Sequence, residues 1–388
     1  MNKHIVQRIS ELKARSYTRF FSIFHAIKPQ ILFSSFRGNQ YSDNQRVISE
    51  YMFNNYPEIE INWVLNSNKN PYGLVPSYVK RVKYGTRQFY QALSQSFCFI
   101  TNNEIRPNIV KRENQLFIQT WHGDRGFKKV LYDDLGETDD VYRSNVVRDN
   151  FLTDFCVAGS VYGERRYRSA FRYSGEILKV GMPRNDKLLN FSKNEASEIR
   201  KRLGVPENKK LIMYAPTYRD DKKGKACELV NLHEVLAWLE RETGDDWVGL
   251  YRAHRLGAGI GSDNKVFDVS DYPDASDLLV IADAMITDYS SIAGDFLLLN
   301  RPIVLAMFDL DEYKANGRDL NCSLEDCGFA IAKNSQELYN LLLVSVRENR
   351  MLGYDKAMKY YNVMETGCAT KVVCDRILAF YQKTFGGL

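Results

Sequence analysis

Short apolar runs alternate with helical patterns along most of this chain. The runs are rich in Ile, Val, Phe or Tyr and end at polar residues or glycine, whereas the stretches between them repeat apolar positions every three or four residues. This alternation is typical of parallel sheets covered by helices, so we predict an α/β fold. The predicted strands are Ile31–Phe36, Ile61–Leu65, Val79–Tyr84, Phe97–Thr101, Leu116–Thr120, Phe155–Ala158, Ile177–Val180, Lys210–Tyr214, Val248–Arg252, Lys265–Val269, Ala284–Thr287, Pro302–Ala306 and Phe329–Ala332.

The strands fall into two sets, separated by a charged stretch around residues 190–207. We therefore predict a doubly wound domain over 29–190 and a second one over 191–353, which face each other across a cleft. A long helix, Tyr354–Thr384, is expected to return toward the first domain. Residues 1–28 form a basic amphipathic helix with aromatic bulk, which either packs on its own domain or lies on a membrane surface.

Composition adds constraints on partners and location. A net charge of +5, from 53 basic and 48 acidic residues, favours anionic small partners but not nucleic acid. The seven cysteines form no CxxC pair, and basic residues interrupt the first 28 positions, so we expect reduced thiols and no secretory signal. No apolar run reaches the length of a membrane span.

Two of the five histidines directly follow predicted strands. His122 ends the run Thr120-Trp121-His122-Gly123, and His254 follows the strand that ends at Arg252. Side chains at the carboxyl ends of parallel strands reach the ligand-binding edge of such a sheet. Imidazole exchanges protons near neutral pH, so both histidines are candidate catalytic residues.

A strand followed at once by a helix at Asp288-Tyr289-Ser290-Ser291 predicts an anion site. Free N–H groups of the first helical turn and the hydroxyls of Ser290 and Ser291 suit a phosphate, although a plain helix cap has the same residues. Further loops after strands carry Arg184 and Asn185, and Thr217 and Arg219. Neither a metal-binding cluster nor a glycine-rich phosphate loop occurs, so we expect no metal and no cofactor.

These motifs, in this order, resemble the CDP-glycerol glycerophosphotransferases of teichoic acid and capsule synthesis. The resemblance runs from Ile31 to about Tyr313, and Gln119-Thr120-Trp121-His122-Gly123 is its most recognisable part. The other matching segments are Phe33–Gly38, Tyr41–Asn44, Ala158–Ser160, Gly181–Asp186, Tyr214–Arg219, Arg252–His254, Asp268–Tyr272, Ile286–Ser291, Asn300–Pro302 and Asp309–Tyr313.

The resemblance implies a GT-B-like fold with an acceptor-side first domain, a nucleotide-donor second domain and a final helix over 354–388. It implies transfer of glycerol phosphate from CDP-glycerol to a lipid-linked polymer, with release of CMP, at the inner face of the cell membrane. His122 would be the general base. The expected donor-side residues are His254, Arg252, Ser290, Ser291, Asp288, Thr217, Arg219 and Arg301, and those on the acceptor side or in the cleft are Gly123, Asp124, Arg125, Arg184 and Asn185.

Two departures from the family pattern leave the substrate open. After Trp-His-Gly the family commonly continues Thr-Pro-Leu-Lys, but here the chain reads Asp124-Arg125-Gly126-Phe127. Gly317-Arg318-Asp319-Leu320 replaces the usual Arg-Gly-Phe-Tyr. CDP-ribitol is therefore an alternative donor, and a UDP-sugar glycosyltransferase of the same fold is the alternative from another class.

Overall fold

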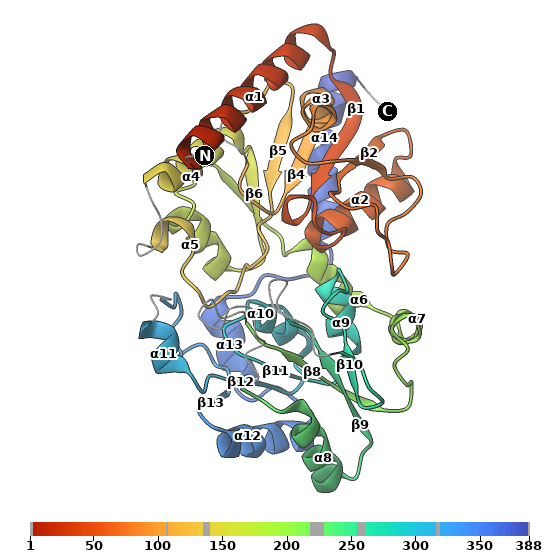
Figure 1. The fold of residues 1–388 in the computed structure, drawn as a ribbon, viewed down its shortest axis with the longest axis vertical. Coiled ribbons are helices and arrows are strands. Elements are labelled where there is room, and N and C mark those ends of the chain that lie inside the picture. The colour runs from red at the N-terminus through yellow and green to blue at the C-terminus, as the bar shows by residue number, and fades with distance from the viewer. Residues whose placement is uncertain are drawn as a thin grey trace. The chain divides into compact units, whose positions relative to one another are not determined.

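Two parallel β-sheets with covering helices form the protein, which confirms the predicted α/β class (Figure 1). The computed structural model describes residues 3–105, 108–134, 140–217, 229–253, 261–315 and 319–386. Every predicted strand is present, with ends that shift by at most three residues. In the described residues, no helix combines the length and the apolar character that crossing a membrane requires.

The first sheet has the order β3-β2-β1-β4-β5-β6-β7, and all its neighbours run parallel. The order reverses between β1 and β4, which creates a switch point at the carboxyl ends of these two strands. The strands are β1 (Lys28–Ser34), β2 (Glu60–Val64), β3 (Lys80–Val82), β4 (Ser96–Thr101), β5 (Leu116–Gln119), β6 (Phe155–Ala158) and β7 (Glu176–Lys179).

The second sheet repeats this plan with the order β10-β9-β8-β11-β12-β13, again parallel throughout. Its switch point lies between β8 and β11. The strands are β8 (Lys210–Ala215), β9 (Trp247–Tyr251), β10 (Val266–Asp268), β11 (Ala284–Thr287), β12 (Ile303–Ala306) and β13 (Ile331–Ala332).

Contacts divide the chain into two compact units. Unit 1 comprises residues 1–122, 131–186 and 364–388, and unit 2 comprises residues 123–130 and 187–363. Besides α6 (Asp186–Asn190), which begins at the boundary, unit 1 contains α1 (Lys3–Phe24), α2 (Asp43–Asn55), α3 (Arg87–Gln95), α4 (Asp140–Leu152), α5 (Val161–Ser169) and α14 (Ala369–Phe385). Unit 2 contains α7 (Lys193–Leu203), α8 (Leu232–Thr243), α9 (Ala275–Ile281), α10 (Ile292–Phe296), α11 (Leu310–Ala315), α12 (Ser335–Glu348) and α13 (Tyr354–Tyr361).

Central strands are buried on both faces, and their aromatic side chains interlock. Phe33 of β1 and Trp63 of β2 are paired in register and stack with ring centroids 5.6 Å apart. Burying side chains of this size stabilises a fold by roughly 1.5–3 kcal/mol each. The sheets are therefore rigid supports for the loops at their carboxyl ends.

The expected single helix Tyr354–Thr384 is two helices. Helix α13 ends at Tyr361, because Asn362 adopts the left-handed conformation with φ of +47°, and Gly367 with φ of +78° precedes α14. Helix α13 belongs to unit 2, whereas α14 belongs to unit 1, where it packs on α2.

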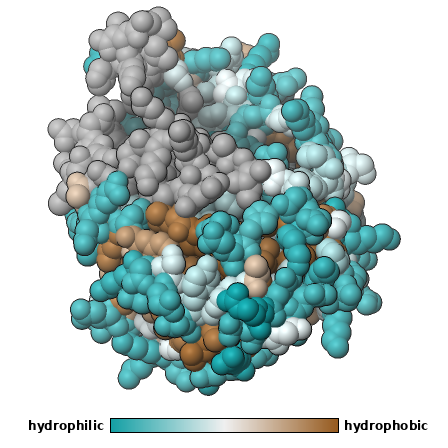
Figure 2. Space-filling view, turned by 60° about the horizontal axis from the view of Figure 1, so that its bottom comes forward, coloured by the Kyte–Doolittle hydropathy of each residue, from teal (hydrophilic) through white to brown (hydrophobic). Residues whose placement is uncertain are grey.

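Helix α1 has one packed face and one exposed face. Ala14, Thr18 and Phe21 are buried where α1 packs against α3. Ile9, Leu12, Ile23 and Phe24 on the other face are each more than half exposed. Elsewhere hydrophilic side chains predominate over the face drawn in Figure 2, and hydrophobic ones are confined to limited patches.

Candidate active site

His122 lies at the carboxyl edge of the first sheet, two residues beyond the Thr120 that follows β5. Its Nδ1 is 2.8 Å from the backbone oxygen of Asn102, which directly follows β4. A carbonyl oxygen can only accept, so Nδ1 must carry the proton in this contact. In the neutral ring Nε2 then holds the lone pair, as a general base requires.

Buried polar residues surround the Asn102 contact at this switch point. The Asn102 side chain donates to Asp43 Oδ2 at 2.6 Å and accepts from the Phe36 backbone N–H at 2.8 Å. Asp43 Oδ1 accepts from Arg184 Nη1 at 2.8 Å, and both side chains of this ion pair are more than nine-tenths buried. The pair occupies the guanidinium of Arg184 within unit 1, so the expected phosphate contact of Arg184 has a structural competitor.

Backbone strain gathers at the same edge. Phe36, Arg37, Asp43 and Trp121 all have φ between 47° and 67°, a conformation that side chains other than glycine and asparagine rarely adopt. Trp121 immediately precedes His122, and the centroids of the two rings are 4.2 Å apart. The backbone N–H of Trp121 donates to Gln119 Oε1 at 2.8 Å. Strained residues of this kind persist where packing over-determines them, and they cluster at functional sites.

Burial lowers the pKa of His122 below its usual range, and the Arg184 charge lowers it further. The Asn102 carbonyl and the carboxylates of Asp43 and Glu104 oppose this shift. The imidazole is therefore neutral at physiological pH, with a lone pair available to accept a proton.

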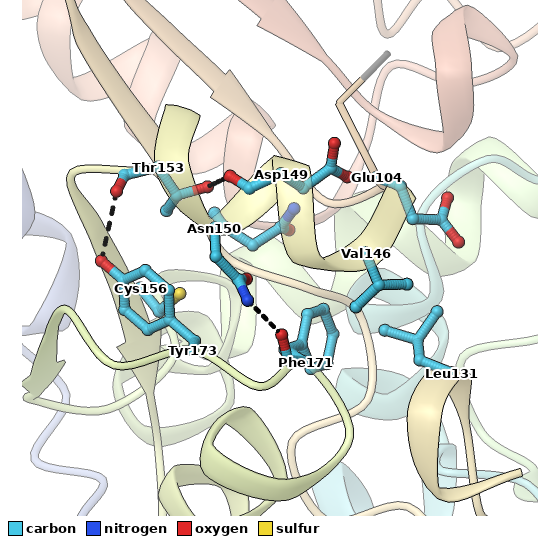
Figure 3. Close-up of a pocket in the computed structure, with 10 residues that line it drawn as sticks. Glu104, Leu131, Val146, Asp149, Asn150, Thr153, Cys156, Phe171 and Tyr173 are labelled. Atoms are coloured by element: carbon cyan, nitrogen blue, oxygen red, sulfur yellow. Dashed lines mark hydrogen bonds between the residues drawn. The ribbon is translucent and has the colours of Figure 1, made fainter. Parts of the chain in front are cut away.

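A small pocket lies in unit 1 beside this edge (Figure 3). Phe171, in its wall, makes an edge contact with Trp121 at 4.8 Å between ring centroids. Burial and the nearby Glu104 raise the pKa of Asp149 to about 8, and Asp149 Oδ1 has no hydrogen-bond partner within the described part of the chain. Figure 3 also shows Asn150 donating to the Phe171 carbonyl, at 2.6 Å. The cavity thus holds a carboxyl group that is largely protonated at neutral pH.

The second switch point is held together by Asp288, which follows β11. Its carboxylate accepts from the backbone N–H of Thr217 at 2.9 Å and 3.0 Å and from the Thr217 hydroxyl at 2.5 Å. It also accepts from the Tyr289 N–H at 2.6 Å. Thr217 follows β8, so Asp288 ties together the loops after the two strands that flank this switch point. Asp288 therefore orients the backbone at this edge.

Ser290 and Ser291 lie between β11 and the short helix α10. The Ser290 hydroxyl accepts weakly from the Ile292 N–H at 3.4 Å, and Ser291 makes no side-chain cap bond. Both residues are partly exposed. The hydroxyls are therefore not consumed by helix capping, which keeps them available for the predicted anion site.

Two predicted donor-side arginines are engaged by backbone carbonyls. Arg252 Nη1 donates to the oxygen of Tyr272 at 2.6 Å and of Val269 at 3.3 Å. Arg301 Nη1 donates to the oxygens of Val280 and Ala282, at 2.8 Å and 2.6 Å, at the carboxyl end of α9. Arg301 thus caps a helix, whereas Arg252 braces the loop over residues 269–272, which precedes α9.

Residues 123–130 follow His122 directly but belong to unit 2. Arg125 is fully buried there, with Nε donating to the Gly294 carbonyl of α10 at 2.7 Å and Nη groups 3.3 Å and 3.2 Å from Asp124 and Asp295. A Cβ on Gly294 would come within 2.5 Å of Arg125 Cβ. The segment expected on the acceptor side or in the cleft, which Gly123 begins, is thus built against the helix that follows Ser290 and Ser291.

The loop from Gly181 to Asp186 anchors the C-terminal helix of unit 1. Asn185 Nδ2 donates to Glu365 Oε1 at 2.8 Å, and the Asp186 carboxylate accepts from the N–H groups of Ala369 and Thr370 at 2.9 Å and 2.6 Å. This carboxylate caps α14. Asn185 therefore has a structural role that its motif did not reveal.

Two predicted site residues, His254 and Arg219, lie outside the described residues. Conversely, sequence reasoning gave no role to Asn102. The available signal was its position directly after β4, in Thr101-Asn102-Asn103, which is equivalent to the position that singled out the histidines. Within the described ranges, no cluster of three or more His, Cys, Asp or Glu side chains is arranged to hold a metal ion.

Known proteins match this chain over most of its length. The teichoic acid poly(glycerol phosphate) polymerase of Staphylococcus epidermidis is 39% identical over 74% of this chain and 41% of that protein. The protein of the same name from Bacillus subtilis is 30% identical over 80% of this chain and 43% of its own length. The chain therefore spans less than half the length of these two relatives.

The solved structures agree with the sequence comparison. A histidine variant of the wall teichoic acid polymerase TagF with CDPG aligns with a TM-score of 0.82 at 32% identity, covering 98% of this chain and 95% of that one. A family model described as CDP-Glycerol:Poly(glycerophosphate) glycerophosphotransferase matches residues 17–379. The chain belongs to this family of glycerophosphotransferases.

Proposed function

We propose that this chain transfers glycerol phosphate from CDP-glycerol to a hydroxyl of a lipid-linked teichoic acid or capsular polymer and releases CMP. The observation that carries the proposal is His122 at the first switch point, with Nδ1 committed to the Asn102 carbonyl and Nε2 left as the proton acceptor. Family membership over residues 17–379 supplies the substrate class.

In the proposed reaction His122 accepts the proton of the acceptor hydroxyl. The oxygen attacks the phosphorus that carries the glycerol, a new P–O bond forms, and the bond to the CMP oxygen breaks. Positioning and charge stabilisation supply most of the rate in such transfers. The neutral state of His122, which burial favours, is the state that this step needs.

Unit 2 is the proposed donor side. Ser290 and Ser291 would donate to the diphosphate, together with the N–H groups that begin α10. Asp288 and Thr217 fix the shape of this edge, and Arg252 supports the adjoining loop. His254 and Arg219 remain sequence-based candidates for diphosphate contacts. We assign Arg301, Arg184 and Asn185 to holding the fold, since each is bound internally.

Release of CMP tests the proposal directly. The purified chain would be incubated with CDP-glycerol, CDP-ribitol or a UDP-sugar, each with and without a membrane fraction that supplies the polymer acceptor. We expect acceptor-dependent release of CMP from CDP-glycerol. Preference for CDP-ribitol would establish the alternative alditol, and release of UDP alone would move the chain to a different reaction class.

We further propose that α1 binds the inner face of the cell membrane. Ile9, Leu12, Ile23 and Phe24 are exposed, and the exposed Arg8, Lys13, Arg15 and Arg19 share the helix. Each cation near an anionic bilayer contributes about 1 kcal/mol, and apolar side chains add reversible insertion.

Vesicle co-sedimentation tests this surface. The test keeps α1 in place, because its buried Phe21 supports unit 1. We expect weaker co-sedimentation with anionic vesicles, at an unchanged unfolding temperature, from a variant in which Ser replaces Ile9, Leu12, Ile23 and Phe24. Val344, exposed on α12, changed to Ser is the matched control. Equal vesicle binding by the α1 variant and the wild type would exclude this helix as the anchor.

A further inference from the structure

Asn102 is locked from three sides while its carbonyl holds His122. Its Oδ1 accepts from the Phe36 N–H, and its Nδ2 lies 2.6 Å from Asp43 Oδ2 and 3.4 Å from Ser35 Oγ. Asn102 is fully buried. Side-chain bonds that fix an asparagine on both sides also fix the direction of its own backbone carbonyl, to which the imidazole donates.

Asp43 is the member of this arrangement that an uncharged residue cannot replace. Oδ1 accepts from Arg184 Nη1 and from the Asn44 N–H at 2.7 Å, and Oδ2 accepts from Asn102. Both oxygens must therefore accept, which a carboxylate does and an amide does not. The residue is only 6% exposed and holds φ of +67°, which indicates that packing keeps it in place.

We propose that Asp43 is a positioning residue for the transfer reaction: through Asn102 it holds the His122 ring in the Nδ1–H tautomer, so that Nε2 accepts the proton. This inference rests on the proposed role of His122 as the base. Asp43 itself touches no reacting atom, and it acts only through the Asn102 side chain.

The charges around His122 give the proposal a signed consequence. Asp43 and Glu104 raise the pKa of His122, and Arg184 lowers it; Glu104 is itself paired with Arg37. Asp43→Asn removes a negative charge and leaves Arg184 uncompensated, so the pKa of His122 falls. Arg184→Gln leaves Asp43 uncompensated, so the pKa of His122 rises.

A neutral base is protonated and inactive below its pKa, so the acid limb of the rate profile follows these shifts. The limb should move to lower pH in Asp43→Asn and to higher pH in Arg184→Gln. Asp43→Asn additionally places an NH₂ group against a donor, either Arg184 or Asn102, which weakens the grip on Asn102. The kcat should fall about ten- to a hundredfold while the donor KM stays within about twofold.

Nitrogen NMR of histidine-labelled protein reads the tautomer and pKa of His122 without any substrate, after assignment with His122→Gln. We expect protonated Nδ1 and bare Nε2 in the wild type and in Arg184→Gln, and a mixture of tautomers in Asp43→Asn. Asp154→Asn is the matched control, because Asp154 also pairs with a cation, Lys111, and a backbone N–H, that of Phe117, but lies before β6.

Either variant that folds decides the matter. A tautomer and pKa of His122 that match the wild type in Asp43→Asn would overturn the positioning role. So would a pKa of His122 that does not rise in Arg184→Gln. Failure of the proposed function looks different, since the wild type would then release no CMP while the NMR signature of His122 still depended on Asp43.

Discussion

The two switch points differ in the conformation of their backbone. In unit 1 the residues with positive φ include Phe36, Arg37, Asp43 and Trp121, all near His122. In the described part of unit 2, the non-glycine residues with positive φ are Asn300, Asn349 and Asn362, which tolerate that conformation. The edge that would supply the base is strained, whereas the edge that would hold the donor is relaxed.

This difference fits the different tasks. A base must present one nitrogen in one orientation. A strained backbone that packing holds in place can fix that orientation. An anion site needs only N–H groups and hydroxyls at a strand–helix junction, which ordinary backbone provides. The same contrast appears in two buried carboxylates: Asp288 accepts from three donors in unit 2, whereas Asp149 in unit 1 retains an oxygen without a partner among the described residues.

The largest effect should come from His122→Ala. If the strained edge serves chemistry, kcat should fall by roughly 10²–10⁴ while the unfolding temperature and donor affinity stay near the wild type. His233→Ala is the matched control, because His233 pairs with Asp263 on the surface of unit 2. Near-normal CMP release by His122→Ala would place the base elsewhere.

Asp288→Ala should instead act on stability. The change removes the acceptor of the buried N–H and hydroxyl of Thr217, so the free energy of unfolding should drop by roughly 2–4 kcal/mol. Donor binding should weaken as well. Denaturant unfolding measures the loss, with the exposed Asp311→Ala as control. An unchanged midpoint would mean that the second edge does not depend on this carboxylate.

Asp149→Asn should change how stability depends on pH. The folded pKa of about 8 lies above the ordinary value of 3.8, so between these values the folded chain holds a proton that the unfolded chain has released. Wild-type stability relative to the variant should therefore fall as pH rises from about 4 to about 8, by up to about 1.4 kcal/mol per pH unit. A difference in the free energy of unfolding between the two proteins that stays constant across this pH range would contradict the raised pKa.

The smallest effect is expected from the double change Ser290→Ala and Ser291→Ala. The backbone N–H groups remain, so the dissociation constant for CDP-glycerol should rise by roughly three- to tenfold, with no loss of folding stability. Calorimetry that shows the same affinity would reduce both serines to residues of a strand–helix turn.

The sequence predicted the strands well because most of them are buried apolar runs, which stand out locally in the sequence. It also placed His122 and Asp288 correctly at strand ends, since strand position is a local property. It could not reveal that Arg184 pairs with Asp43 or that Arg301 caps α9, because these partners are far apart in the chain and many arginines follow strands. The membership of residues 123–130 in unit 2 was hidden for the same reason: no local pattern distinguishes Arg125 from an exposed arginine.

The interleaving of the two units has a consequence for synthesis on the ribosome. Unit 1 holds His122 but also needs α14, whose Val373, Cys374 and Ile377 are completely buried and which is made after both sheets. Unit 2 needs residues 123–130, which emerge before any of its strands. The first-made sheet must therefore wait until α14 has been synthesised to bury its surface. A premature stop after residue 363 would remove α14 from unit 1, which carries the base. It would leave residues 187–363 of unit 2 complete.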